Sequence, residues 1–252
     1  MAQPVQGQPT GGEKGAQWMP APPERPVGCP PGLEYLTQLD QILVHQQVEL
    51  LEAILNWETK NRYVVKNSMG QQVFFAREES GLCWRLCCQQ GRPFVMHITD
   101  NNNEEVIRIV RPFQCCAGCC WCADGGNCCS LTINIESPPG TIVGTVTQTR
   151  SSWKPEMNVM NSSGETVLKI RGPCCLCNMV CCRCDIQFAV MSADLTQEVG
   201  IISKQWAGAI KEMFTNADTF SITFPRDLDV KVKAVLVGAL FLIDFMFYEQ
   251  KN

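Results

Sequence analysis

The chain has 252 residues, of which 45% are hydrophobic and 18% are charged, and its formal net charge is -4. This composition is typical of a globular protein, and the negative charge, with no long basic run, argues against a surface that binds nucleic acid. The N-terminus lacks the apolar segment behind a basic one that marks a secretory signal, so we expect the protein to stay in the cytosol or nucleus.

Residues 1–31 contain eight of the fifteen prolines and no Leu, Ile or Phe. Such a segment buries too little apolar area to offset the entropy lost on ordering, which predicts a disordered tail. Prolines in residues 20–26 have P-x-x-P spacing, which suits a polyproline II ligand of an SH3-like, aromatic-lined groove. The favoured alternative is a flexible linker without a partner, because such spacing arises freely in Pro-rich sequence.

Residues 32–252 are predicted to form one folded domain. Between residues 33 and 57 the apolar spacing suits either a helix or a strand. A hairpin-like pattern, in which an extended apolar run is followed by Asn or Asp and a Val-led return strand, then recurs. It occurs at residues 64–74, 97–107, 159–168 and 190–202. The pattern predicts an antiparallel all-β domain, closed into a barrel so that no long apolar edge is exposed.

The 17 cysteines are an odd number in a chain expected in a reducing compartment, which argues against a disulfide framework. Most fall in two clusters that follow Pro112 and Pro173. The first cluster contains Cys115, Cys116, Cys119, Cys120, Cys122, Cys128 and Cys129, and the second contains Cys174, Cys175, Cys177, Cys181, Cys182 and Cys184.

Three interpretations of these thiols remain open. C-x-x-C spacings such as Cys116/Cys119 and Cys174/Cys177 could hold structural Zn²⁺, although the clusters have more sulfurs than one tetrahedral site uses. S-acylation needs only accessible thiols near a bilayer, and we favour it for residues 115–122. Buried apolar thiols are the third interpretation, which suits the group Cys83, Cys87 and Cys88.

Several segments carry a resemblance to a known family. They are CPPGLEYL at 29–36, DQILVHQQ at 40–47, SPPG at 137–140, ISKQW at 202–206, residues 220–229 and FLIDFMF at 241–247. Together they resemble the phospholipid scramblases, in the same order from about residue 29 to residue 249. The resemblance implies a tubby-like fold, a roughly twelve-stranded antiparallel closed barrel around a central apolar C-terminal helix. It therefore favours strand over helix for much of residues 41–57.

The resemblance also implies an activity and a location. The activity is calcium-stimulated, ATP-independent, bidirectional movement of phospholipids between membrane leaflets. The location is the cytoplasmic face of a membrane, with the plasma membrane expected. The family's palmitoylation segment corresponds here to Cys115, Cys116, Cys119, Cys120 and Cys122, although Ala117, Gly118 and Trp121 interrupt the family's continuous cysteine run.

The family's calcium segment corresponds to residues 216–229, where Asp218, Asp227 and Asp229 are the carboxylates. Calcium prefers six to eight oxygen ligands, so three carboxylates predict weak Ca²⁺ binding. The alternative is a buried strand with acids at its ends, indicated by the alternation of Phe220 and Ile222 with polar residues.

Residues 230–248 form a predicted apolar helix. Its members include Ala234, Leu236, Gly238, Leu240, Leu242 and Asp244. The resemblance implies a single-pass membrane anchor here. The uncharged run from residue 234 to 243 is only about 15 Å of helix, however, against a hydrocarbon core of roughly 30 Å. A helix that is apolar on all sides also suits the interior of a barrel, where Asp244 could find a hydrogen-bond donor, and we favour that interpretation.

Two functions follow from the sequence. The first is a phospholipid scramblase, and the alternative is a palmitoylated, membrane-tethered adaptor that binds lipid head groups and protein partners without moving lipid. An enzyme is not expected, because the chain has only two histidines and no recognisable nucleophile, base or phosphate-binding motif. The sequence is compatible with oligomers but does not specify their number of subunits.

Overall fold

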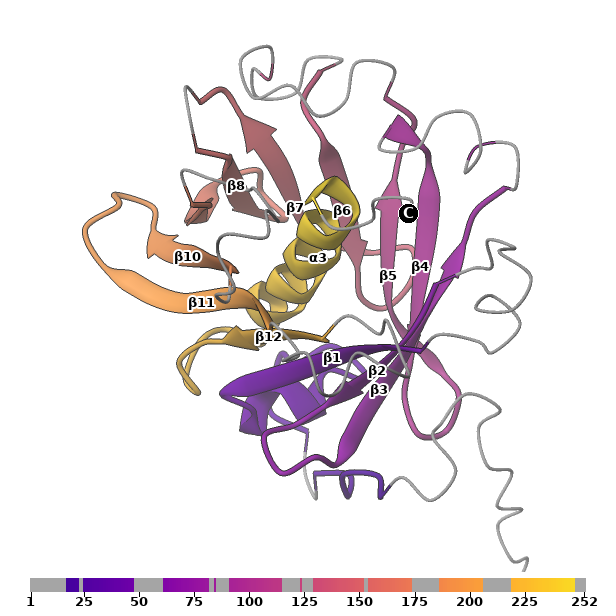
Figure 1. Ribbon diagram of the computed structural model, residues 1–252. Coiled ribbons are helices and arrows are strands. Elements are labelled where there is room, and N and C mark those ends of the chain that lie inside the picture. The colour runs from indigo at the N-terminus through magenta and orange to yellow at the C-terminus, as the bar shows by residue number, and fades with distance from the viewer. Residues whose placement is uncertain are drawn as a thin grey trace, which may run out of the picture.

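The structure is a computed structural model. It describes residues 17–22, 25–47, 61–81, 84, 91–114, 123, 129–151, 154–173, 186–205 and 219–247. Within these ranges, twelve antiparallel strands form a barrel that closes where β1 pairs with β12, and helix α3 (Val230–Phe247) runs through its interior (Figure 1). The predicted fold class is therefore confirmed.

The strands pair in the order β1-β12-β11-β10-β9-β8-β7-β6-β5-β4-β3-β2, so nearly every neighbour in the sheet is a neighbour in sequence. Their bounds are β1 (Gln41–Gln47), β2 (Arg62–Lys66), β3 (Gln72–Glu79), β4 (Phe94–Thr99), β5 (Glu105–Arg111), β6 (Thr132–Glu136), β7 (Ile142–Thr149), β8 (Glu156–Asn161), β9 (Thr166–Arg171), β10 (Ile186–Ser192), β11 (Glu198–Gln205) and β12 (Thr219–Thr223). A 3₁₀ helix, η1 (Glu34–Gln38), precedes β1.

The four predicted hairpins are all present, as β2–β3, β4–β5, β8–β9 and β10–β11. Three of their turns use the same side-chain hydrogen bonds. Asn67 Oδ1 accepts hydrogen bonds from the backbone N–H of Met69 (3.0 Å) and of Gln71 (2.9 Å). Asp100 and Asn161 likewise accept from the N–H groups two and four residues later. The Asn or Asp that the sequence pattern places at each turn therefore fixes the reversal of the chain.

The ambiguous region after residue 33 is a strand over Gln41–Gln47, while residues 48–60 lie outside the described ranges. Ile42 and Val44 are fully buried and alternate with half-buried Gln41 and Leu43. This two-residue period is that of a strand with one face against the core. The segment preceding it is η1, whose Leu36 is also buried.

The structure differs from the sequence prediction at residues 17–22 and 25–31, which we call the strap. The Met19 N–H donates to the Gln72 carbonyl (2.8 Å), and the Gln72 N–H donates to the Gln17 carbonyl (2.9 Å). Met19 and Cys29 are buried in the core cluster. Backbone groups at the start of β3 and two buried side chains therefore hold part of the predicted disordered tail on the barrel.

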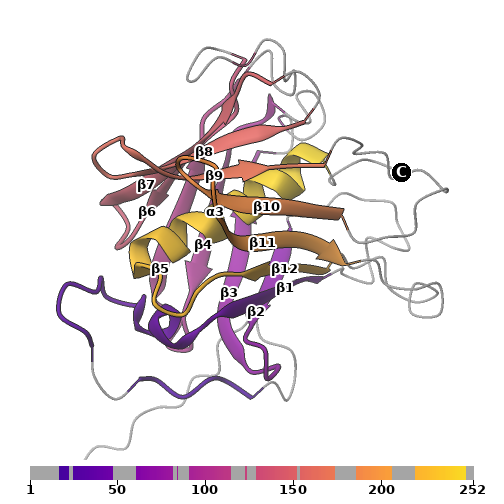
Figure 2. The same cartoon turned by 90° about the vertical axis from the view of Figure 1, so that its left-hand side faces the viewer.

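The barrel has two different ends. The tight hairpin turns, the strap and the first turn of α3 lie at one end, which we call the turn end. The opposite end, the loop end, is formed by the described residues that follow β3, β5, β7 and β9 or precede β4, β6 and β8. In Figure 2, α3 runs from the turn end to the loop end, where its last residues stack on aromatic side chains of β4 and β10.

Helix α3 fills the interior of the barrel. Residues 233–246 are all buried, including the six predicted members Ala234, Leu236, Gly238, Leu240, Leu242 and Asp244. The backbone lies close to β6, since a Cβ added at Gly238 would come within 2.6 Å of Ile135 Cγ1. Among the described helices, none has the length and apolarity needed to cross a membrane. The structure therefore agrees with the favoured interpretation, in which this helix is the core of the barrel.

Asp244 is the acidic side chain inside this apolar helix, and the structure gives it a donor. It is 4% exposed, and its Oδ2 accepts a hydrogen bond from Tyr63 Oη at 2.7 Å. Tyr63 is itself buried in β2, with its ring packed edge-on against Phe241 at 5.0 Å. The contact thus joins the loop-end half of α3 to the barrel wall.

We predict that Tyr63→Phe lowers the free energy of unfolding by about 2 kcal/mol, because a buried carboxyl loses a hydrogen-bond donor. Urea unfolding measures the change. Tyr35→Phe is the matched control: Tyr35 is also buried, but its hydroxyl donates to Asn101 Oδ1 at 3.2 Å and its loss should cost less. Equal losses in the two variants would contradict a special role for the Tyr63 to Asp244 contact.

Candidate functional site

The predicted acylation cysteines, Cys115, Cys116, Cys119, Cys120 and Cys122, lie outside the described residues, as does the second cluster. The chain on their N-terminal side is described. Gln114 N–H donates to the Gly91 carbonyl at 3.0 Å, which ties the residues after β5 to those before β4 at the loop end. No group of three or more potential metal ligands occurs among the described residues. Acylation and zinc binding therefore remain predictions.

The predicted calcium ligands are only partly described. Asp218 lies outside the described residues, while Asp227 and Asp229 are exposed between β12 and α3. Asp229 caps the helix, because its Oδ1 accepts hydrogen bonds from the N–H of Lys231 (2.8 Å) and of Val232 (3.2 Å). Phe220 and Ile222 are fully buried on β12, and Ser221 between them is also buried, so this segment is a buried strand without an exposed polar face. The structure gives Asp229 a helix-capping role, and calcium binding remains a prediction.

Sequence reasoning missed the environment of Lys233. The side chain is completely buried, and its Nζ donates to the carbonyl oxygens of Leu36 (3.0 Å), Leu39 (2.8 Å) and Arg226 (2.7 Å). Its Nζ also lies 5.0 Å from the centre of the Phe224 ring. The ammonium group therefore ties the first turn of α3 to η1 and to the β12–α3 connection. The sequence did contain one indication of this environment, which is a lysine at the start of an otherwise apolar predicted helix.

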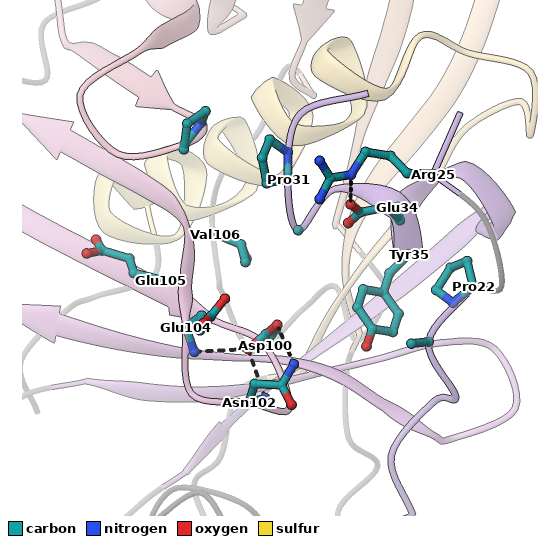
Figure 3. Close-up of a pocket in the computed structure, with 13 residues that line it drawn as sticks. Pro22, Arg25, Pro31, Glu34, Tyr35, Asp100, Asn102, Glu104, Glu105 and Val106 are labelled. Carbon is teal, nitrogen blue, oxygen red and sulfur yellow. Dashed lines mark hydrogen bonds and ion pairs between the residues drawn. The ribbon is translucent and has the colours of Figure 1, made fainter. Parts of the chain in front are cut away.

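A pocket of about 650 Å³ opens at the turn end, between the strap and the β4–β5 turn (Figure 3). Arg25 and Glu34 form an ion pair on one side, and Asp100, Asn102 and Glu104 lie on the other. Its remaining walls include Pro22, Pro31, Tyr35, Glu105, Val106 and Pro138. Sequence reasoning missed this pocket, because it joins residues that are far apart in the chain.

Close contact between β5 and Gly32, the residue directly after the strap, shapes one wall of the pocket. Gly32 has a φ of +86°, and a Cβ added there would lie 2.1 Å from Val106 Cγ1. Only glycine allows both this backbone conformation and this approach. The chain is therefore packed directly against β5 where it leaves the strap, beside the pocket.

The pocket has an excess of negative charge. Four carboxyl groups line it, on Glu34, Asp100, Glu104 and Glu105, against the guanidinium of Arg25. Burial acts to raise the pKa of Glu105, but hydrogen bonds from Arg108 (2.7 Å) and His97 (2.8 Å) lower that pKa below its ordinary value. Chemically, carboxylates beside proline and tyrosine rings can receive a small organic cation.

The same negative charge affects the pKa of Tyr35. Burial raises the pKa of its hydroxyl, and the nearby carboxylates of Asp100 and Glu34 raise that pKa further. The hydroxyl therefore stays protonated and donates to Asn101 Oδ1. Tyr35 offers the pocket a neutral aromatic wall.

Comparison with known proteins places this barrel in a family. A family profile described as Scramblase matches residues 19–250. The chain is 52% identical over 250 residues to phospholipid scramblase 2 of Bos taurus, covering 98% of this chain and 82% of the relative. It is 51% identical to phospholipid scramblase 1 of Mus musculus (98% and 74% covered) and 39% identical to phospholipid scramblase 4 of Homo sapiens (92% and 68% covered).

No solved structure matches the chain significantly. The sequence matches extend over the strap, the twelve-stranded barrel and α3. The chain therefore belongs to the scramblase family, as its sequence motifs indicated.

We predict a pH-dependent contribution of Lys233 to stability. Burial lowers the pKa of its ammonium group below 10.5, with partial compensation from Asp227 and Asp40. The unfolded chain then binds the proton more tightly than the folded chain does. Wild-type stability relative to Lys233→Met should therefore rise as pH increases toward 10.5, by at most about 1.4 kcal/mol per pH unit.

Urea unfolding at several pH values measures this difference. The control is Lys231→Met, which removes an exposed lysine two residues earlier and should leave the pH profile unchanged. Parallel profiles for wild type and Lys233→Met would show that burial does not shift the proton affinity of Lys233.

Proposed function

We propose that this protein moves phospholipids in both directions between the leaflets of a membrane, stimulated by calcium and without ATP. The observation that carries the proposal is identity of about one half, over 98% of this chain, to proteins named phospholipid scramblase. These matches span the barrel together with α3 and the turn-end pocket, so they support a shared working unit rather than one shared motif. The proposed activity is transport and makes or breaks no covalent bond.

Attachment to the membrane is assigned to acyl chains. Since residues 233–246 of α3 are buried in the barrel, the helix cannot contact lipid without leaving it. Each acyl methylene buried in lipid contributes about 0.8 kcal/mol, so two or more chains would give stable attachment. We assign these chains to the set Cys115, Cys116, Cys119, Cys120 and Cys122, at the cytoplasmic face of the plasma membrane.

A specific observation favours the adaptor as the second candidate. Inside the barrel, Asp244 accepts a hydrogen bond from Tyr63. Residues 233–246 of α3 are buried and fill the barrel interior. While the helix remains there, the interior offers no polar path for a lipid head group. An adaptor would need no such path and would recruit a protein with a groove for Pro-rich ligands to residues 20–26, where Pro20 is exposed.

Reconstitution into vesicles tests the proposal, and a disulfide between α3 and β6 tests the part that the helix plays. A Cβ at Gly238 would lie 2.6 Å from Ile135 Cγ1, so the side chains of the double variant Ile135→Cys/Gly238→Cys meet and can form a disulfide. We expect calcium-dependent movement of labelled phospholipid by the wild type. We expect at least a roughly tenfold slower rate in the oxidised double variant, because α3 cannot leave the barrel, and recovery on reduction.

The controls are the reduced double variant and Ile135→Cys alone, treated with the same oxidant. Peptide mapping confirms the intended bond among the native cysteines. Absence of lipid movement by the wild type at every protein density would refute the scramblase proposal and leave the adaptor. Unchanged movement by the oxidised variant would instead show that lipid moves while the helix stays enclosed.

A test of Asp229 as a calcium ligand must separate loss of calcium binding from loss of the helix N-cap. Asp229→Ala removes the N-cap and should lower the free energy of unfolding by about 1 kcal/mol, whereas Asp229→Ser keeps a capping oxygen and should be nearly as stable as the wild type. If the carboxylate is a calcium ligand, both variants will need more calcium for half-maximal lipid movement.

The matched variant Asp227→Asn has no such N-cap to lose. It removes a charge that favours the buried Lys233 ammonium, so it should shift the calcium requirement with a smaller loss of stability than Asp229→Ala. Calcium titration of lipid movement and urea unfolding together separate the two roles. An unchanged calcium requirement in both Asp229→Ser and Asp227→Asn would remove these residues from the calcium site.

A further inference from the structure

Two exposed aromatic side chains meet at the loop end. Trp84, between β3 and β4, is 42% exposed, and Phe113, after β5, is 46% exposed. Their ring centres are 5.0 Å apart, with the ring planes inclined by 45°. Trp84 also lies against Gly81, where an added Cβ would be 3.0 Å from Trp84 Cδ1. The pair is therefore held in place while about half of its surface faces outward.

Packed side chains hold the residues at the start of β4. Phe94 at the start of β4 stacks on Phe245 of α3, with centroids 4.1 Å apart, and the Arg92 guanidinium lies 4.8 Å from the Phe245 ring centre. Arg92 also pairs with buried Glu78 at 3.0 Å. These contacts hold the residues before β4 against the helix. The residue after Phe113 is tied to this region, because the Gln114 N–H donates to the Gly91 carbonyl.

The described residues at the two ends of the barrel differ in charge. Among the described connections at the loop end none is acidic, and Arg150 and Lys154, on either side of the β7–β8 reversal, are exposed. Acidic strand residues near this end have partners: Glu79 binds His97 and Glu156 binds Arg171. The described turns at the opposite end carry Asp100, Glu104, Glu165, Asp194, Asp227 and Asp229 against Arg226.

We propose that the loop end is the membrane-contacting face, with Trp84 and Phe113 placed in the lipid–water interface of an anionic leaflet. Aromatic side chains favour that interface, and each nearby Lys or Arg gains about 1 kcal/mol from anionic lipid. The acidic turn end is repelled by the same surface and faces away. The segment predicted to be acylated begins directly after Gln114, at the same end of the barrel.

This inference rests on the proposed membrane function but concerns only orientation, so it is tested by binding rather than by lipid movement. Full-length protein made without acylation is mixed with vesicles of phosphatidylcholine alone or with about 30% phosphatidylserine, and bound protein is separated by flotation. Trp84→Ser/Phe113→Ser should bind the anionic vesicles roughly tenfold more weakly than the wild type. The matched control is Met69→Ser/Ile142→Ser, which removes two exposed apolar side chains from the turn end and should bind normally.

Charge reversal gives a second variant that leaves the packed aromatic layer untouched. Arg150→Glu/Lys154→Glu should lose binding selectively for anionic vesicles and most strongly at low salt, since exposed charges are screened as salt increases. Thermal melts confirm that each variant is folded.

Three outcomes would overturn the proposal. They are no binding of the wild type to either vesicle, equal losses in the aromatic variant and its turn-end control, and undiminished binding by both loop-end variants. Lipid movement by a protein that bound through another face would refute this orientation alone, whereas binding through the loop end without lipid movement would refute the scramblase proposal alone.

Discussion

Enclosure of α3 is the constraint on which the rest of the structure depends. A helix that is apolar on every face must be surrounded, and a sheet can surround it only by closing on itself. The pairing of β1 with β12 provides that closure. The two charged side chains inside the buried stretch are satisfied where the barrel opens, Lys233 by three carbonyl groups at the turn end and Asp244 by Tyr63 toward the loop end.

This arrangement gives the two ends of the barrel different chemistry. Strap residues and short acidic turns cover one end and form the negatively charged pocket. At the other end, Phe94 and Arg92 pack on Phe245 of α3, and Trp84 and Phe113 form an exposed aromatic pair. The membrane activity of the family and the enclosed helix are compatible if the barrel contacts lipid through its loop end and α3 moves only during transport.

Local sequence patterns predicted most of the fold, because local physics determines it. The four hairpins follow from alternating strands and from Asn or Asp at the turn, whose side chain bonds its own backbone. The apolar helix was visible in the sequence, and comparing its length with the bilayer correctly favoured the barrel interior. The family resemblance supplied the number of strands, which periodicity alone did not.

The sequence was less informative about contacts between distant residues. Met19 lies in a Pro-rich segment whose composition predicts disorder, yet its backbone pairs with Gln72 of β3. The three carbonyl groups around Lys233 come from η1, the residue directly after η1 and the β12–α3 connection, so no local spacing indicates them. The acidic pocket arises in the same way, and the predicted acylation cysteines lie outside the described residues.

The strap and the exposed aromatic pair lie at opposite ends of the barrel, about one helix length apart. The strap lies at the turn end with exposed Pro20, while Trp84 and Phe113 lie at the loop end, and the 18 residues of α3 connect the two. At 1.5 Å per residue, that helix is about 27 Å long. In the proposed orientation, with the loop end on the bilayer, a protein recruited to the proline-rich strap would be held one barrel length above the membrane, clear of the lipid head groups.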